Sequence, residues 1–327
     1  MRNRTLVKTW IVSSVLGAAS VLGSVAVAAG DYPSRTVKVI VPYSPGGAVD
    51  IVGREISGGM SKRLGESFVV ENRPGAGSNL AMAAVAAAEP DGYTLLVASP
   101  AAVVNKYLYK DLPYDTLRDF APIGLAAKVP SVLIASPAGT ASSVQELLQS
   151  AKQSPSVVFA HGGNGSSEHL ASEMLRMYGK VNFISVPYKG GMAALPDLMA
   201  GRAHYMFTSL MQVKQLIESG KVKALAVADD KRSPSLPNVP TFAEAGLPEI
   251  KMAVWYGLLA PKHTPPQVID ILSGAMQATL QDAGLRKQLE DRGADILNEG
   301  PQGFAKFLSD QDARAKALIE TQKISIN

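Results

Sequence analysis

Apolar and polar positions follow two alternating patterns along this chain of 327 residues. Short β-branched runs such as 37–41 have the composition of strands that are buried on both faces of a sheet. Segments such as 51–64 repeat apolar residues every three to four positions, which is typical of a helix with one buried face. This alternation predicts an α/β protein built on a parallel sheet.

Glycine, proline and the apolar period together predict the positions of the elements. Strands are predicted at 37–41, 68–71, 94–98, 132–135, 157–160, 183–186, 204–207, 224–228 and 254–259. Helices are predicted at 51–64, 78–88, 143–152, 167–178 and 192–200, followed by a tail of helices alone at 265–280, 283–293 and 301–321. The length predicts two lobes, and no repeat of solenoid period is visible.

The first predicted strand ends in a glycine turn that opens a helix. This turn consists of Tyr43, Ser44, Pro45, Gly46 and Gly47. Asp50 is in position to cap the helix. The first N–H groups of a helix lack internal partners and carry the positive end of its dipole, so a carboxylate or phosphate is stabilised there. The alternative is that these glycines only make the turn that a strand-to-helix connection needs.

A second strand, glycine loop and helix start follow about 115 residues later. The loop and helix start contain Asn164, Gly165, Ser166, Ser167 and His169. Ser166 or Ser167 can cap the helix, and free N–H groups would lie at the carboxyl end of a strand, where open α/β sheets bind ligands. Two such loops facing each other would form one anion site. The alternative is a flexible loop with His169 on the flank of the helix.

A third segment of this kind, Tyr188-Lys189-Gly190, lies between a strand and the helix at 192–200. Its residues are candidate ligand contacts. The alternatives are that Lys189 is a solvated surface charge and that Tyr188 packs in the core.

Residues 1–28 have the organisation of a cleaved signal peptide. Arg2, Arg4 and Lys8 precede an apolar, small-residue run, and Ala26-Val27-Ala28 forms a cleavage site. Removing these three basic residues lowers the formal net charge from +4 to +1. Nucleic acid is therefore not an expected partner, because no basic stripe with interleaved aromatic residues remains.

The chain has no cysteine and four histidines. A core of this size needs no disulfides, and the absence of thiols excludes thiolate and cysteine–metal chemistry. His161 and His169 are eight positions apart, which matches none of the usual helical metal spacings, so no metal site and no cofactor are expected.

The rival function is that of an exported serine hydrolase acting on a carboxylic ester, with Ser166 as nucleophile, His169 as base and a distant acid. No G-x-S-x-G turn occurs, and the two residues lie one turn apart on the same helix start. This geometry makes the hydrolase the weaker hypothesis.

Several ordered blocks resemble the extracytoplasmic receptors of tripartite tricarboxylate transporters, the Bug-type solute-binding proteins. The matching blocks lie at 45–50, 71–77, 90–95, 112–115, 119–123, 186–190 and 236–241. The resemblance covers nearly the whole mature chain. It implies a two-lobed α/β Venus-flytrap fold of the type II-like periplasmic-binding-protein class, with crossing hinge strands and no catalysis.

By the same resemblance, lobe 1 comprises 31–130 plus 254–327, and lobe 2 comprises 131–253. A monomeric receptor in the periplasm would capture a small carboxylate between the lobes and deliver it to the membrane permease subunits. Implied ligand contacts are the loop from Ser44 to Asp50, and Asn79, Ser99, Asn164, Gly165, Ser166, His169, Tyr188, Lys189 and Gly190. Closure about strands near Pro130 and Val254 would bury the ligand.

The chain departs from the family pattern after the strand at 204–207. Thr208 and Ser209 stand where many relatives carry an acidic residue, and His204 stands where a second acid is usual. A hydroxyl at Thr208 can donate to a carboxylate but cannot neutralise an ammonium group, so we expect a mono- or dicarboxylic acid without an amine.

Overall fold

A computed structural model describes residues 32–139, 141–154 and 156–322. The predicted signal peptide lies outside these residues. Within the described part of the chain, no helix is both long enough and apolar enough to cross a membrane. The elements are β1 Val37–Val41, α1 Ala48–Leu64, β2 Phe68–Asn72, η1 Ala76–Ser78, α2 Asn79–Ala86, β3 Thr94–Ala98, α3 Ala101–Leu108, α4 Thr116–Asp119, β4 Phe120–Ala135, α5 Val144–Gln153, β5 Val158–His161, α6 Ser167–Tyr178, β6 Ile184–Pro187, α7 Gly191–Met199, β7 Tyr205–Ser209, α8 Leu210–Glu218, β8 Lys223–Val227, β9 Ala253–Pro261, α9 Pro266–Gln281, α10 Ala283–Asp291, β10 Asp295–Glu299 and α11 Pro301–Gln322.

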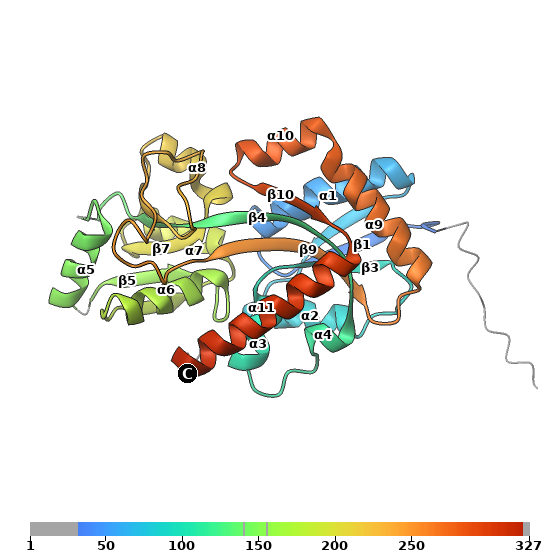
Figure 1. The fold of residues 1–327 in the computed structure, drawn as a ribbon, viewed down its shortest axis with the longest axis horizontal. Coiled ribbons are helices and arrows are strands. Elements are labelled where there is room, and N and C mark those ends of the chain that lie inside the picture. The colour runs from blue at the N-terminus through green and yellow to red at the C-terminus, as the bar shows by residue number, and fades with distance from the viewer. Residues whose placement is uncertain (1–31, 140, 155, 323–327) are drawn as a thin grey trace, which may run out of the picture. The chain divides into compact units, whose positions relative to one another are not determined.

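The strands form a mixed sheet in the order β2-β1-β3-β9-β4-β7-β5-β6, with β8 and β10 also paired to β4 (Figure 1). Strand β1 is parallel to β2 and β3, and β5 is parallel to β6 and β7. The central strands β4 and β9 run antiparallel to their neighbours. The predicted parallel sheet is therefore correct for each outer part and wrong for the centre.

Strand β4 links the two outer parts because it pairs with both of them. Its first part, Phe120 to Pro130, pairs with β9, and its last part, Ser131 to Ala135, pairs with β7. Figure 1 shows β4 in green beside β9 in orange. At the junction the Ser131 N–H donates to the Met252 carbonyl (3.1 Å), so the chain passes between the two parts twice at adjacent positions.

The sequence predicted only 132–135 of this 16-residue strand. Pro122 and Pro130 interrupt the apolar pattern of the part that pairs with β9, and proline cannot donate to a strand ladder. The structure accommodates the irregularity with register shifts between Pro122 and Gly124 and between Leu125 and Ala127. Such bulges insert an extra residue and break the two-residue alternation by which a strand is recognised.

The predicted all-helical tail is wrong at β10, which pairs antiparallel with β4. Strand β10 has only two central apolar residues, Ile296 and Leu297, and both are half-buried. It therefore lacks the alternation that identifies a half-buried strand. Helices α3 and α8 were also not predicted.

The core forms around the helix faces that the apolar spacing predicts. Val52, Ile56 and Met60 of α1 are buried with β1 residues in one apolar cluster. A second cluster in the β4–β8 region contains Phe159 and Phe207, both fully buried. Helices therefore cover the faces of both outer parts of the sheet. The ends of the parallel strands are not covered in this way and are available for a site.

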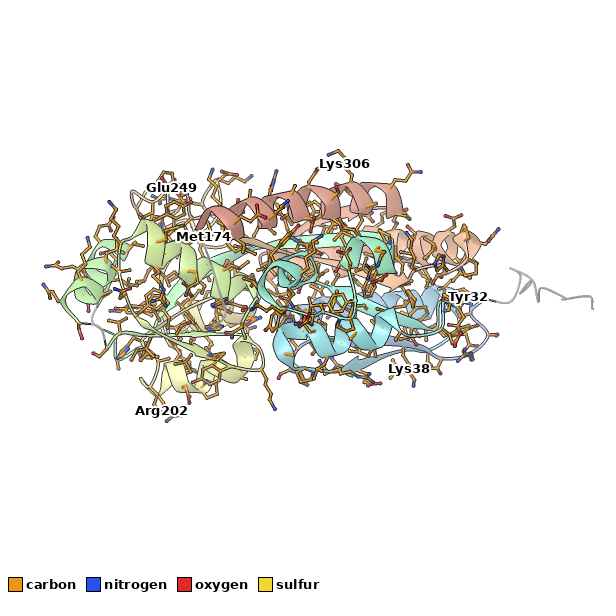
Figure 2. All side chains as sticks on the ribbon, turned by 90° about the horizontal axis from the view of Figure 1, so that it is seen from below. Tyr32, Lys38, Met174, Arg202, Glu249 and Lys306 are labelled. Atoms are coloured by element: carbon orange, nitrogen blue, oxygen red, sulfur yellow. The ribbon has the colours of Figure 1, made fainter. Side chains whose placement is uncertain are left out.

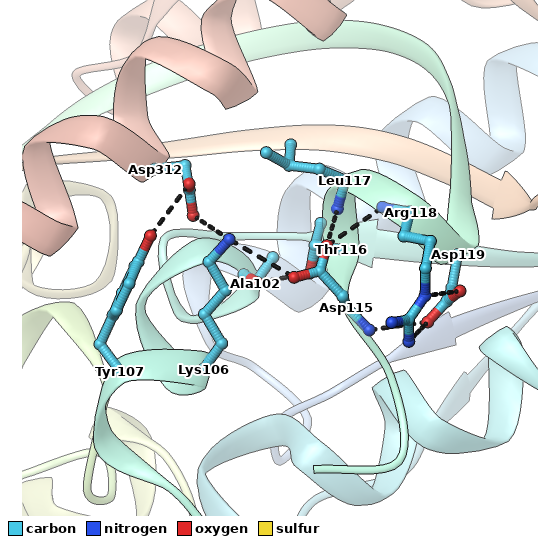
Figure 3. Close-up of polar contacts among 9 residues, drawn as sticks. All are labelled: Ala102, Lys106, Tyr107, Asp115, Thr116, Leu117, Arg118, Asp119 and Asp312. Carbon is cyan, nitrogen blue, oxygen red and sulfur yellow. Dashed lines mark hydrogen bonds and ion pairs between the residues drawn. The ribbon is translucent and has the colours of Figure 1, made fainter.

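Polar contacts attach the C-terminal helix to α3 (Figure 3). Asp312 of α11 pairs with Lys106 Nζ at 2.8 Å and accepts a hydrogen bond from Tyr107 Oη at 3.0 Å. Asp115 caps α4 by accepting from the N–H groups of Leu117 and Arg118. These contacts attach α11 to α3, the helix that follows β3.

Two glycine substitutions test the packing. A Cβ at Gly257 of β9 would lie 2.5 Å from Phe304 Cζ and 2.7 Å from the Gly124 oxygen, so we expect Gly257→Ala to lower the free energy of unfolding by about 1–3 kcal/mol. At Gly274 of α9 no atom lies within 4 Å, and Gly274→Ala should raise it by roughly 0.5–1 kcal/mol. Urea unfolding measures both, and a stable Gly257→Ala protein would contradict the packing described.

Candidate functional site

A small cavity lies where the two groups of parallel strands end. Its volume of about 30 Å³ is room for about two water molecules. The lining residues are Tyr43, Ser44, Gly47, Ala48, Val49, Ser99, Ser167, Glu168, Gly190, Gly191, Met192, Gln212, Val254 and Tyr256. They come from the β1–α1 connection, the β6–α7 connection, the starts of α6 and α8, the end of β3 and strand β9.

Three helix N-termini converge on this cavity. Gly47, Ala48 and Val49 are the N-cap and first two residues of α1; Ser167 and Glu168 open α6; Gly191 and Met192 open α7. First-turn N–H groups have no acceptor inside their own helix, and each helix places partial positive charge at this end. The arrangement therefore stabilises an anion.

The turn before α1 depends on Gly46, which has φ +82° and so favours glycine. Asp50 is not the cap that the sequence predicted, because the N-cap is Gly47 and Asp50 is the third helical residue. Its carboxylate instead accepts from the Gly46 N–H at 2.9 Å and from Arg54 and Asn72. Burial opposes ionisation of Asp50, but these hydrogen bonds outweigh it and hold its pKa below the usual value.

The start of α6 follows the prediction. Ser166 is the N-cap, and its Oγ accepts from the His169 N–H at 3.2 Å. The His169 ring does not face this hydroxyl, because its Nδ1 accepts from the Gly165 N–H at 3.3 Å. Among the described residues we find no hydrogen bond between the Ser166 hydroxyl and an imidazole. The nucleophile–base pair that a hydrolase requires is not formed.

The two histidines of this loop pack together, with ring centroids 4.7 Å apart. Burial is the main cause that lowers the pKa of each ring to about 4; the neighbouring His169 adds to the effect on His161, and Arg176 adds to that on His169. Both rings are therefore neutral at pH 7. No cluster of three or more potential metal ligands occurs in the described part of the chain.

Hydrogen bonds connect the loops on opposite sides of the cavity. Ser44 Oγ donates to the Lys189 carbonyl at 2.6 Å, and Tyr109 Oη donates to the Asn164 carbonyl at 3.0 Å. The predicted glycine loops are thus brought face to face. The contact of Lys189 is its backbone oxygen, while its side chain is exposed.

The structure places five of the sequence-predicted site residues on the cavity wall: Tyr43, Ser44, Gly47, Ser99 and Gly190. Ser166, Thr208, Gly165 and His169 are buried beside it, whereas Pro45 and Gly46 are exposed. Asn79 is buried away from the wall, where Oδ1 accepts from Asn105 and Tyr114. Tyr188 donates to Asp197, and neither it nor Asn164 lines the cavity.

Sequence reasoning missed Glu168, Gln212 and Tyr256. Gln212 lies in the first turn of α8, a helix that was not predicted. Tyr256 lies on β9, where burial raises the pKa of its phenol. Glu168 follows two serines at the predicted start of a helix. Acids are common at this position because they interact favourably with the N-terminus of their own helix, so Glu168 did not stand out as a ligand contact.

The lining contains no lysine or arginine, and Glu168 is its one charged residue. Basic side chains such as Lys38, Arg202 and Lys306 lie on the outer surface (Figure 2). Burial raises the pKa of Glu168, and hydrogen bonds from its own backbone N–H and from Ser166 oppose this more weakly. Backbone dipoles therefore dominate the positive potential in the cavity.

The fold and this site define a two-lobed periplasmic binding protein. The model of the tripartite tricarboxylate transporter family receptor matches residues 52–324, and the chain belongs to this family. The predicted resemblance and fold class are confirmed. Members and structural neighbours are substrate-binding proteins and not enzymes, so the hydrolase hypothesis is wrong.

Three solved structures of similar proteins show how closely the fold is shared. The periplasmic binding protein BugD is 34% identical, with a TM-score of 0.88 over 90% of this chain and 100% of its own. Rpa4515 of R. palustris, solved with adipate, is 33% identical, with a TM-score of 0.87 over 90% and 100%. MatC from Rhodopseudomonas palustris, with bound malate, is 33% identical, with a TM-score of 0.84 over 88% and 100%.

The histidine pair predicts a pH dependence of stability. Because the pKa of each buried ring falls from 6.5 unfolded to about 4 folded, the unfolded chain binds more protons between these values. Stability is therefore complete above about pH 6.5, and it should fall by on the order of a few kcal/mol by pH 4. Urea midpoints across this range measure the loss. His161→Asn should lose less on acidification, and an equal loss would show that His161 does not contribute.

Proposed function

We propose that the mature protein is a periplasmic receptor that captures a small mono- or dicarboxylic acid in this cavity and delivers it to the permease of a tripartite tricarboxylate transporter. The observation that carries the proposal is the convergence of α1, α6 and α7 at their N-termini on a cavity without lysine or arginine. Export through cleavage of residues 1–28 is part of the same proposal.

The structures of two relatives support the ligand class. Rpa4515 is described with adipate and MatC with malate, both at 33% identity to this chain. Each of these ligands carries two carboxylates. Backbone N–H groups reach carboxylate oxygens directly or through ordered water, and water bridges need not weaken binding.

Ligand contacts are proposed on both sides of the cavity. On one side they are the N–H groups and hydroxyls of Ser44, Gly47 and Ser99 with the Tyr43 phenol; on the other they are the loop from Asn164 to Ser166 with His169, and the turn from Tyr188 to Gly190. Asp50, Pro45 and Gly46 would act by shaping the turn before α1. Each side alone presents only part of the donors, so a ligand links them.

The cavity volume of about 30 Å³ is too small for a dicarboxylate, so the sides must separate to admit one. We place the hinge at the Pro130–Ser131 step of β4 and its neighbour near Val254, with lobes at 31–130 plus 254–327 and at 131–253. Ligand binding favours closure only if it binds the closed form more tightly, and the permease would then recognise that form.

A thermal-shift panel tests the ligand class. Adipate or malate at about a hundred times its dissociation constant should add about 2.7 kcal/mol to the free energy of unfolding and raise Tm by several degrees. Sugars and cations of similar size should produce no shift. Stabilisation by cations alone, with none by any carboxylate, would contradict the proposal.

A side chain at Gly47 tests the position of the ligand. Gly47 has φ −73°, so substitution causes no backbone strain, and a Cβ there lies 3.6 Å from Gln212 Nε2 on the cavity wall. Gly47→Val should weaken carboxylate binding at least tenfold, about 1.4 kcal/mol, in calorimetry. The control is Gly58→Ala on the exposed side of the same helix, where no atom lies within 4 Å. Equal affinities of both variants would place the ligand elsewhere.

A further inference from the structure

A groove separate from the anion cavity lies along the other face of strand β9. Successive residues of a strand point to opposite faces of the sheet. Val254 and Tyr256 line the cavity, whereas Ala253 and Trp255 line the groove, and none of the described residues borders both. The groove has a volume of about 370 Å³. Small-molecule sites commonly measure about 300–1,000 Å³, so the groove has room for a ligand of its own.

The walls of the groove come from both outer parts of the sheet. Val103 of α3 and Phe307 of α11 lie on one side, and Leu170 and Met174 of α6 lie on the other; Figure 2 labels Met174 near the end of α11. The Trp255 ring packs edge-on against Phe307, with ring centroids 5.5 Å apart. The groove therefore has an apolar lining, and its shape depends on how the two outer parts are placed.

Two hydrogen-bond donors of this lining have no acceptor among the described residues. Only 2% of Trp255 is exposed, and its indole N–H is buried and unpaired in that part of the chain. Arg314 of α11 likewise has no acid or carbonyl partner there, although a guanidinium carries five N–H donors. Buried donors are normally paired, so the groove favours an occupant that supplies an acceptor.

The charges around the groove favour an anion over a cation. Its acids, Asp229 and Asp230, already have donors: Lys251 pairs with Asp230, and Asp229 Oδ1 accepts from the Asp230 N–H at 2.7 Å. Arg314 is left without an acid among the described residues. A bound carboxylate would pair with Arg314, whereas a bound cation would have to compete with an existing donor.

We propose that this groove is a second ligand site, which takes an aromatic monocarboxylate. The ligand ring would pack on Trp255, Phe307 and Leu170, because aromatic rings bury a large area and prefer offset or edge-to-face contacts. Its carboxylate would pair with Arg314 through charge-assisted hydrogen bonds. The ligand would also supply the acceptor that the Trp255 N–H lacks.

The position of the groove links it to the anion cavity. A ligand that contacts both α3 and α6 stabilises the arrangement of the two outer parts in which the cavity is also formed. Each ligand should then raise the affinity of the other by the same factor, although the two never touch. This coupling, unlike the groove itself, rests on the carboxylate-binding function proposed above for the cavity.

Tryptophan fluorescence tests the site directly. The two tryptophans of the chain are Trp10 and Trp255, and Trp10 lies in the predicted signal peptide. In protein that lacks residues 1–28, Trp255 is therefore the only tryptophan. 3-Phenylpropionate should change its emission saturably, and the uncharged 3-phenylpropanamide should bind about fivefold more weakly because it cannot form an ion pair.

Matched variants separate the groove from the cavity. Arg314→Gln should weaken 3-phenylpropionate binding about fivefold. The control is Lys316→Gln on the exposed side of the same helix and outside the lining, which removes an equal charge and should leave the affinity unchanged. Gly47→Val, which obstructs the cavity, should leave this affinity within about threefold.

Calorimetry measures the coupling. Saturating 3-phenylpropionate should tighten binding of adipate or malate about threefold or more in the unaltered protein, and the gain should shrink in Arg314→Gln. Failure of adipate and malate to bind, with the Trp255 response intact, would contradict the receptor function and leave the groove site standing.

Three results would overturn the inference. The first is no saturable response of Trp255 to 3-phenylpropionate. The second is equal affinity of Arg314→Gln and Lys316→Gln for this probe. The third is a loss of binding in Gly47→Val but not in Arg314→Gln, which would place the probe in the anion cavity and leave the receptor function intact.

Discussion

The proposed site depends on an electrostatic constraint: the cavity wall contains the starts of three helices and no basic side chain, so an anion there would be stabilised by backbone dipoles. The residues that line the cavity from α1, α6 and α7 are first-turn or cap residues, whose N–H groups have no carbonyl acceptor within their helix. Because these donors are part of the backbone, the fold itself positions them and no side-chain entropy is lost on binding. The same constraint explains the glycine at position 46, whose φ of +82° turns β1 into α1.

The constraint also connects binding to movement. Donors from α1 belong to one group of parallel strands, and donors from α6 and α7 belong to the other. The two groups share only the central strands, with β4 passing from one to the other at Pro130 and Ser131. A ligand that binds both groups at once therefore stabilises their approach, which is how a binding protein can report its occupied state.

Much of this architecture could be predicted from the sequence, and the failures have physical causes. The strands at 37–41 and 94–98 and the faces of α1 and α6 followed directly from apolar spacing. Most of β4 was missed because its prolines and bulges disturb that spacing, and β10 because a partly exposed strand with two apolar residues has too weak a pattern. Central antiparallel pairing depends on contacts between distant segments, which no local window contains.

The backbone segments of the site could be predicted from the sequence, but most of the side chains that line it could not. Glycine loops at 46–47 and 162–165 marked two helix starts, and Ser166 was correctly identified as a possible cap. Glu168 and Gln212 become neighbours only when α6 and α8 are folded against α7, so their proximity could not be read from the chain. Asp50 was given the wrong position because Gly47, with φ −73° and ψ 165°, is the N-cap and Asp50 is the third residue of the helix.

A crystal structure with the tightest-binding ligand tests the central claim most directly. The account predicts carboxylate oxygens within hydrogen-bond distance of first-turn N–H groups at Gly47 or Ala48 and at Gly191 or Met192, directly or through one water. A ligand bound outside this cavity, or one whose anionic group is held by a lysine or arginine side chain, would contradict it.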